Sequence, residues 1–238
     1  MTDVRGPEAG PLTAVFRRRE SFRKPGRGPR VVDLGDRDRV RAPHDPAVAE
    51  HVRLHQAFLG RVVDYLVADA GVRQFVDWGC PVPGTAERVR RADPEATVVH
   101  IAPEGAAGIL ASPDGSAVLS GDGACSETLL RRLHTSGLVD LDEPVAVLMT
   151  RPFGEDSPPT GLDTLHRLMR GGGYLALTST APRADVEPAF DPFLLLEPGV
   201  ADLTWWPYPD EDVAAQGSGV LAGLGRAPRR GGGTTRWR

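Results

Sequence analysis

The first place in this sequence where residue types and spacing could do chemistry is a glycine turn after a short apolar run. The run Phe75–Asp77 ends in an acid, and Gly79 follows two positions later at the start of a loop. A carboxylate there can orient nearby backbone or a ligand amine, and a glycine lets the backbone approach a ligand closely. Because the same pair is found in many turns that bind nothing, the turn alone leaves both interpretations open.

The histidines and cysteines raise the question of metal binding. His51 and His55 are spaced as a zinc pair on a helix would be, but no third ligand accompanies them, so we expect a pair on the helix surface. His100 is the histidine nearest the expected cleft, where a polar residue at a strand end explains it equally well. Cys80 and Cys125 form no Cys-x-x-Cys pair, and we expect both to be half-buried. No metal site is predicted.

The elements that must position these residues alternate between helix and strand. A long amphipathic helix is expected to start after Asp45 and to end at Gly71. This alternation predicts an α/β fold with a doubly wound, mainly parallel sheet. Ligands bind at the carboxyl ends of the strands in such a sheet, which is where Asp77 and Gly79 lie. The predicted strands are 75–77, 97–101, 117–120, 144–150 and 172–179, and the predicted helices are 85–92, 126–134 and 161–170.

Charge divides the chain into a central domain and two ends. Residues 1–43 carry eleven Arg and Lys against six Asp and Glu, and residues 229–238 are rich in arginine and glycine. We expect a basic, disordered arm at 1–43 and a disordered tail at 229–238, on either side of a domain at 44–228. The basic ends could contact phosphates, but the acidic domain between them would repel a duplex, so no nucleic-acid partner is expected.

The distribution of apolar residues bears on the compartment. No stretch reaches the roughly 18 apolar residues that a membrane span requires. The first residues also lack the apolar core of a secretion signal. We therefore expect a cytoplasmic protein with no membrane partner.

Six segments taken together are more specific than the glycine turn. They are HQAFLGRVVDYLVADAGVRQFVDWG (55–79), DPEATVVHI (93–101), EPVAVLM (143–149), RGGGYLALTS (170–179), LLLEPGVADLTWWPY (194–208) and GVLAGLGRAP (219–228). In this order they resemble an actinobacterial family of S-adenosylmethionine-dependent methyltransferases that was long catalogued as a domain of unknown function. The resemblance covers residues 48–228 and implies a class I methyltransferase, with a Rossmann-like sheet and a late antiparallel strand.

The resemblance implies S-adenosylmethionine as the cofactor, held by the first turn and the ends of the next strands. Carried over by position, Asp77 and Gly79 match the first motif of the family. Glu104 lies near the place of the ribose-contacting acid, and Asp122 matches the acid after the third strand. These four residues are the cofactor-binding candidates, and a small molecule is the implied methyl acceptor.

The sequence departs from the family pattern at the cofactor motifs. Pro81 stands where the second glycine of the first loop belongs, and proline has neither an N–H nor the freedom of glycine in φ. Ala102 stands at the usual place of the acid that binds both ribose hydroxyls, a loss that typically costs about 1.5–3 kcal/mol. Nothing in residues 1–47 matches the lid signature of the family. We therefore expect weak cofactor binding.

Two further features have alternative explanations. Arg151 could bind an anionic substrate, or it could pair with Glu155 or Asp156 in its own loop, and we expect the loop salt bridge. Trp205, Trp206 and Tyr208 could line an aromatic acceptor pocket, or they could pack in a late hairpin at the sheet edge, and we expect packing.

Three functions remain compatible with the sequence. The first is an active S-adenosylmethionine-dependent methyltransferase that acts on a small molecule with an atypical cofactor loop. The second is a catalytically inactive binding or regulatory protein that keeps the fold and forms a homodimer or pairs with an intact relative. The third is the same fold used for another small-molecule reaction. Family resemblance favours the first function, whereas Pro81 and Ala102 favour the second.

Overall fold

The computed structural model describes residues 46–79, 84–102, 116–121, 125–207 and 217–230. The chain divides into two units, Met1–His44 and Asp45–Arg238, and every described residue belongs to the second unit. The predicted basic arm at 1–43 therefore lies outside the described residues.

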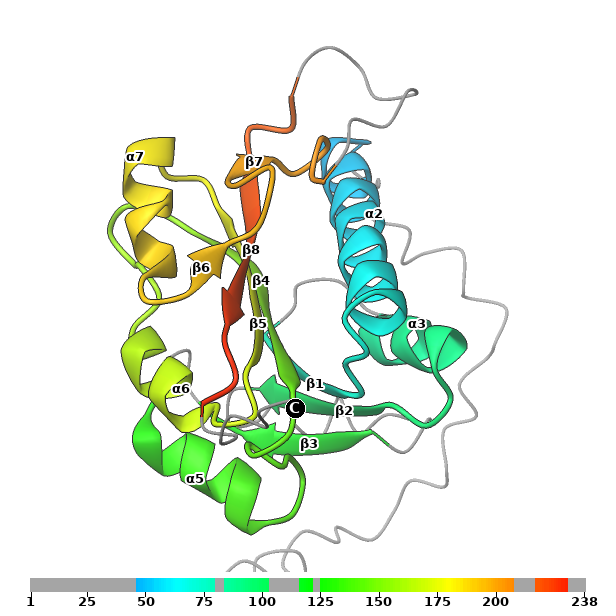
Figure 1. Cartoon of the computed structure of the whole chain (residues 1–238). Helices are drawn as coiled ribbons and strands as arrows, with labels where there is room; N and C mark the ends of the chain where they lie inside the picture. Colours follow the sequence, from blue (N-terminus) through cyan, green and yellow to red (C-terminus); the bar gives the residue numbers. More distant parts are fainter. Residues whose placement is uncertain (1–45, 80–83, 103–115, 122–124, 208–216, 231–238) are drawn as a thin grey trace, which may run out of the picture. The chain divides into compact units, whose positions relative to one another are not determined.

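An eight-stranded sheet forms the centre of this second unit (Figure 1). Its order is β3-β2-β1-β4-β5-β8-β6, and β7 also pairs with β8. The pairs among β1 to β5 are parallel, and β8 runs antiparallel to β5, β6 and β7. The predicted doubly wound, mainly parallel sheet with a late antiparallel strand is confirmed. The strands are β1 (Gln74–Trp78), β2 (Thr97–Ala102), β3 (Ala117–Ser120), β4 (Val145–Phe153), β5 (Gly173–Ser179), β6 (Leu194–Leu195), β7 (Ala201–Asp202) and β8 (Leu221–Ala227).

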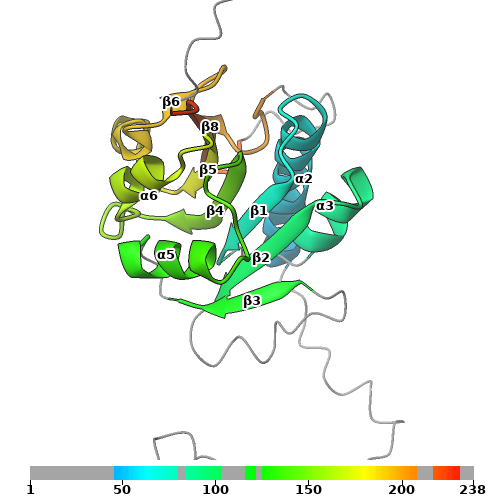
Figure 2. The ribbon, with the colours of Figure 1, turned by 60° about the horizontal axis from the view of Figure 1, so that its bottom comes forward.

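Helices cover both faces of the sheet, and the two layers lie on opposite sides in Figure 2. Alternate strand residues enter the two layers, so that Phe75 of β1 packs under α2 and α3, and Val76 packs under α5 and α6. Within the described part of the chain, no helix is long and apolar enough to span a membrane. The helices are α2 (Pro46–Ala68), α3 (Thr85–Ala92), α5 (Glu127–Thr135), α6 (Leu162–Leu168), α7 (Arg183–Val186) and the 3-10 helix η3 (Pro188–Phe190).

The element boundaries follow local backbone chemistry. Ser126 caps α5, because its side chain accepts a hydrogen bond from the Leu129 N–H at 3.3 Å. The turn after α2 contains Gly71 at φ +63°, as the sequence predicted. Strand β4 continues past the predicted end at residue 150, because its register against β5 shifts between Met149 and Phe153. Such a bulge bends a strand and re-aims its side chains.

The late tryptophans are divided between the core and the surface. Trp206 is buried and meets the Phe58 ring of α2 edge-to-face, with ring centroids 5.6 Å apart. The Arg61 guanidinium donates to the Trp206 carbonyl at 2.6 Å and to the Leu203 carbonyl at 2.8 Å, which fixes this segment onto α2. Trp205 is 42% exposed. The packing role expected for this segment is confirmed for Trp206.

Candidate functional site

A cavity of about 680 Å³ lies at the carboxyl ends of the parallel strands. Residues at the ends of β1, β2, β3, β4 and β5 line it, together with the loop from β4 to α6. The strand order reverses between β1 and β4, and doubly wound sheets bind ligands in the crevice at that point. The volume falls within the roughly 300–1,000 Å³ of small-molecule pockets.

One half of the cavity wall comes from β1, β2 and the residue after β3. Trp78 and Gly79 line it at the end of β1, with Ile101 at the end of β2 and Gly121 after β3. Gly79 adopts φ +71°, and its N–H donates to the Ile101 carbonyl at 3.2 Å. Among the described residues, no atom lies within 4 Å of the position that a Cβ at Gly79 would take. The structure therefore places the predicted glycine turn against open space in the cavity wall.

Asp77 lies beside this turn but points to the other face of the sheet. Residues two apart in a strand share a face, so Asp77 follows Phe75 toward the α2 and α3 layer, and Trp78 faces the cavity. Asp77 is 4% exposed, and its Oδ2 lies 3.2 Å from Nδ1 of His100, its register partner on β2. This contact joins β1 to β2 directly behind the cavity.

Of the remaining positions that the sequence linked to cofactor binding, the structure describes Ala102. Glu104, Asp122 and Pro81 lie outside the described residues. Ala102 is the last residue of β2, and it is 1% exposed. Among the described residues, Ile101 lines the cavity and Ala102 does not. The alanine predicted to stand in place of the ribose-binding acid is therefore buried, and its methyl side chain has no atom that could accept a hydrogen bond from the ribose.

The other half of the cavity wall comes from β4, β5 and the β4–α6 loop. The bulge in β4 supplies Arg151 and Phe153, and Leu177 comes from β5. The loop adds Asp156 among other residues. The expected salt bridge of Arg151 with Glu155 or Asp156 is wrong, because within the described residues no carboxylate lies within ion-pair distance of Arg151.

Backbone hydrogen bonds hold this second half in place. The Phe153 carbonyl accepts from the Thr180 N–H at 2.9 Å and from the Ser179 hydroxyl at 2.8 Å. At the other end of the loop, the Cys125 N–H donates to the Thr160 carbonyl at 3.1 Å. Both ends of the loop are therefore tied to neighbouring elements.

Cys125 is a structural residue of this wall. It was expected to be half-buried, but it is 1% exposed, and its Sγ lies 3.9 Å from the Met149 sulfur. Burial raises the pKa of the Cys125 thiol to about 12. Because the thiolate is the nucleophilic form, this cysteine has no reactive role at neutral pH.

His55 is the residue of this region that the sequence analysis misplaced. The expected helix-surface pair is wrong for His55, whose side chain is 0% exposed, and correct for His51, which is exposed. Nδ1 of His55 lies 3.2 Å from the His51 carbonyl, and within the described residues Nε2 has no hydrogen-bond partner. Burial, and then the neighbouring His51, lower the pKa of His55. Its spacing of three and four from the buried Phe58 and Leu59 was the signal that could have placed it inside.

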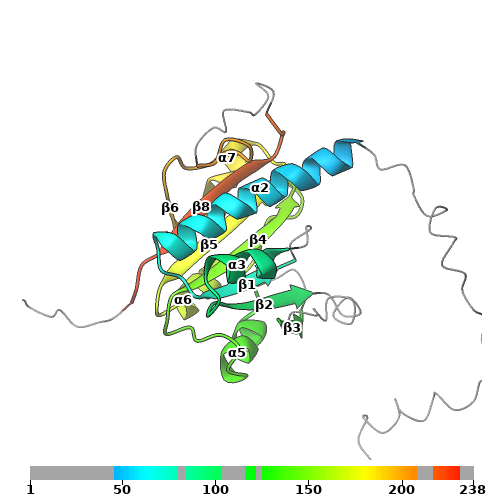
Figure 3. The ribbon, with the colours of Figure 1, turned by 90° about the vertical axis from the view of Figure 1, so that its right-hand side faces the viewer.

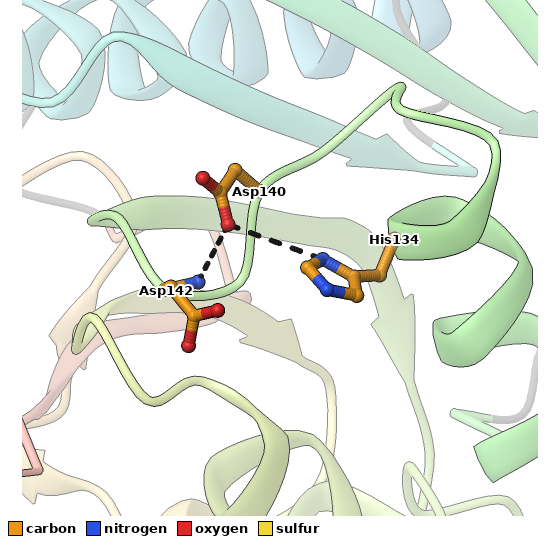
Figure 4. A group of neighbouring side chains, drawn as sticks. All are labelled: His134, Asp140 and Asp142. Carbon is orange, nitrogen blue, oxygen red and sulfur yellow. Dashed lines mark hydrogen bonds and ion pairs between the residues drawn. The ribbon is translucent and has the colours of Figure 1, made fainter.

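A second group of polar side chains lies between α5 and β4, where Figure 4 shows Asp140 between His134 and Asp142. Their potential ligand atoms lie within 4.8 Å of one another. However, Arg170 pairs with both Asp142 oxygens, and Asp140 Oδ1 accepts the Asp142 N–H at 2.9 Å. The Arg170 guanidinium also lowers the pKa of Asp142. These contacts explain the group as the network that shapes the α5–β4 loop.

The chain is similar to methyltransferases in sequence and in fold. A family model described as S-adenosyl methyltransferase matches residues 32–184. A protein of Thermobifida fusca YX assigned to the methyltransferases is 25% identical, with a TM-score of 0.60 over 76% of this chain and 83% of its own. A duf574 family protein of Streptomyces avermitilis MA-4680 is 24% identical, with a TM-score of 0.61 over 77% and 86%. No curated protein sequence matches the chain.

Proposed function

Because this chain belongs to the S-adenosyl methyltransferase family, we propose that it transfers the methyl group of S-adenosylmethionine to a small molecule bound in the cavity at the carboxyl ends of the strands. The observation that carries the proposal is the Gly79 turn. It lines a cavity of pocket size at the point where the strand order reverses.

The two halves of the wall suit the two reactants. Gly79 at φ +71° leaves open space where a side chain would stand, which fits the close approach of a bound cofactor. The half formed by β4, β5 and the β4–α6 loop is then available to the methyl acceptor. When bound, S-adenosylmethionine supplies an electrophilic methyl group, so the protein needs no nucleophile of its own.

The residues of the cavity act by positioning and by excluding water. Methyl transfer is an in-line displacement, and the geometry of the reactants supplies most of its acceleration. Trp78, Met149, Phe153 and Leu177 give the wall an apolar surface. A protein base is required only for an acceptor that must lose a proton first.

Cofactor affinity is expected to be low. Ala102 offers no acceptor for the ribose hydroxyls, and Asp77 is engaged with His100 on the other face of the sheet. In a calorimetric titration of the full chain with S-adenosylhomocysteine, we expect a Kd weaker than about 100 μM, a binding free energy near −5.5 kcal/mol. A low-micromolar Kd would show that other residues replace the missing contacts.

The place of the cofactor is tested by two matched glycine substitutions. Gly79 and Gly71 have φ of +71° and +63°, and neither has a described atom within 4 Å of a built Cβ. Alanine should therefore cost each about 1–2 kcal/mol of stability through backbone strain. Only Gly79 lines the cavity, so only Gly79→Ala should weaken S-adenosylhomocysteine binding, by tenfold or more. Equal affinities of the two variants would place the cofactor elsewhere.

A second candidate is a catalytically inactive member that binds a ligand and regulates a partner. Ala102 favours it, because the acid that usually binds both ribose hydroxyls is missing at this position. Titration with S-adenosylmethionine and a search for released S-adenosylhomocysteine separate the two functions. Binding without any turnover would favour the regulatory protein.

A further inference from the structure

We propose that the methyl acceptor carries an anionic group, a carboxylate or a similar oxyanion, and that Arg151 binds this group in the cavity. The inference rests on the proposed function, because it assigns the β4–β5 half of the cavity to the acceptor. It adds the chemical class of the substrate and the residue that recognises it.

Arg151 is placed at the cavity by an irregularity of the sheet. The register between β4 and β5 shifts between Met149 and Phe153, and Arg151 lies within this bulge. Bulges re-aim side chains and occur often beside active sites. Arg151 is exposed and lines the cavity, so its guanidinium is accessible to a ligand.

Arg151 differs from the described arginines that pair with a nearby acid. Arg131 pairs with Glu127 at 2.7 Å, and Arg170 pairs with Asp142. Arg151 has acidic residues four and five positions away in its own loop, yet in the part of the chain that the structure describes it makes no ion pair. A guanidinium presents its donors in a planar fork that matches a carboxylate. Its charge is therefore available to a ligand.

The surroundings of Arg151 define the rest of the ligand. Met149, Phe153 and Leu177 supply apolar contacts, and prolines 152, 158 and 159 add further apolar surface. Asp156 is in the same wall and would repel an anion placed next to it. An acceptor with an apolar body and an anionic end would therefore bind in one orientation, with its anion at Arg151.

S-adenosylmethionine also carries a carboxylate, and topology decides between it and the acceptor. The glycine turn follows β1, whereas Arg151 comes from β4, on the side of β5 and the β4–α6 loop. The cofactor half of the wall is formed by Trp78, Gly79, Ile101 and Gly121. Arg151 is thus assigned to the acceptor.

The test compares matched anionic and neutral probes on the full chain. The pairs are 1-naphthoate with 1-naphthamide, and indole-3-acetate with indole-3-acetamide, titrated with and without S-adenosylhomocysteine. We expect each carboxylate to bind the native chain at least tenfold more tightly than its amide. Arg151→Gln should remove this preference. Arg183→Gln, which changes an exposed arginine of α7 that pairs with Glu187 at 3.5 Å, should keep it.

The inference is overturned if the native chain binds carboxylate and amide equally, or binds neither in the millimolar range. It is also overturned if the Arg151→Gln variant keeps the preference for the carboxylate. A tenfold loss of S-adenosylhomocysteine affinity in Arg151→Gln, with unchanged affinity for methylthioadenosine, would also overturn it. In that case Arg151 would hold the carboxylate of the cofactor, and the proposed function would stand.

The proposed function can also fail while the assignment of Arg151 holds, and the two results can be told apart. A chain that binds the carboxylates through Arg151, but binds no S-adenosylhomocysteine in any variant, would overturn the proposed function. The assignment of an anionic ligand to Arg151 would then remain. Melting temperatures of both variants, expected to match the native chain, show that any loss comes from the binding site.

Discussion

Replacing Gly161 by alanine is expected to lower the free energy of unfolding by about 3 kcal/mol or more, from strain at positive φ together with overpacking. Gly161 adopts φ +79° at the start of α6, and a Cβ there would lie 2.3 Å from the Cys125 carbonyl oxygen. That oxygen belongs to the backbone, so the β4–α6 loop and the segment before α5 would have to separate. The Cys125 N–H to Thr160 carbonyl bond joins the same two segments, so we expect it to weaken as well.

Gly137→Ala is the matched control for this substitution. Gly137 has φ +70° after α5, but no atom of the described residues lies within 4 Å of a Cβ built there. It should lose only about 1–2 kcal/mol through strain. In thermal unfolding we expect Gly161→Ala to melt at least about 2 °C below Gly137→Ala, since their losses differ by at least about 1 kcal/mol and this corresponds to 2–4 °C at this chain length. Equal melting temperatures would show that the close approach of the two segments is not a constraint on the fold.

The strand and helix pattern could be predicted because burial on both faces of a parallel sheet leaves a strong signal in the sequence. β4 is a continuous apolar run from Val145 and was predicted from that run alone. Its end was not, because the bulge at Arg151 depends on pairing with β5, which no local pattern records. The short strands β6 and β7 were foreseen only as a late hairpin, since two residues carry no periodicity.

The sequence predicted where the candidate site lies in the fold, but it did not predict which side chains contact one another there. Gly79 could be placed because a glycine after the first strand of a doubly wound sheet lies at the ligand edge. The partner of Asp77 could not, because His100 reaches it through strand register rather than through sequence proximity. Arg151 was assigned to a local salt bridge from its acidic neighbours. Whether nearby charges meet depends on the path of the loop, which the sequence does not state.

His55 shows how an energetic cost can mark a residue of interest. It is fully buried near the middle of α2, the helix that lies across one face of the sheet in Figure 3, and it is close to the backbone of Thr150, the residue before Arg151 in β4. Within the described residues its Nε2 has no hydrogen-bond partner. An unsatisfied buried polar group costs about 1–3 kcal/mol. The fold therefore carries a cost at His55 that an apolar side chain would not impose.

His55→Leu is accordingly expected to stabilise the protein, and the gain should grow as the pH falls. At pH 7.5 we expect a gain of about 1 kcal/mol from removing the unsatisfied nitrogen. The pKa of His55 is lowered in the folded state, first by burial and then by His51. When the pH falls below about 6.5, the pKa of histidine in the unfolded chain, the unfolded chain takes up a proton that the folded chain does not. The native protein therefore loses stability as the pH falls further, until the pH reaches the lowered pKa of His55 in the folded chain.

This proton linkage sets the size of the effect in acid. One proton contributes up to about 1.4 kcal/mol at pH 5.5, so the total gain of His55→Leu there should reach about 2 kcal/mol. Burial, and then the charge of Arg230, also lower the pKa of His166, so part of the acid sensitivity should remain in this variant. His51→Leu is the control for the gain at pH 7.5, because His51 is exposed and its replacement removes no buried nitrogen. Since His51 is the second cause that lowers the pKa of His55, this variant should reduce the acid sensitivity only in part. Urea unfolding of both variants at pH 7.5 and 5.5 measures the difference. A gain that is the same at both pH values would show that His55 is protonated to the same extent in the folded and unfolded chains.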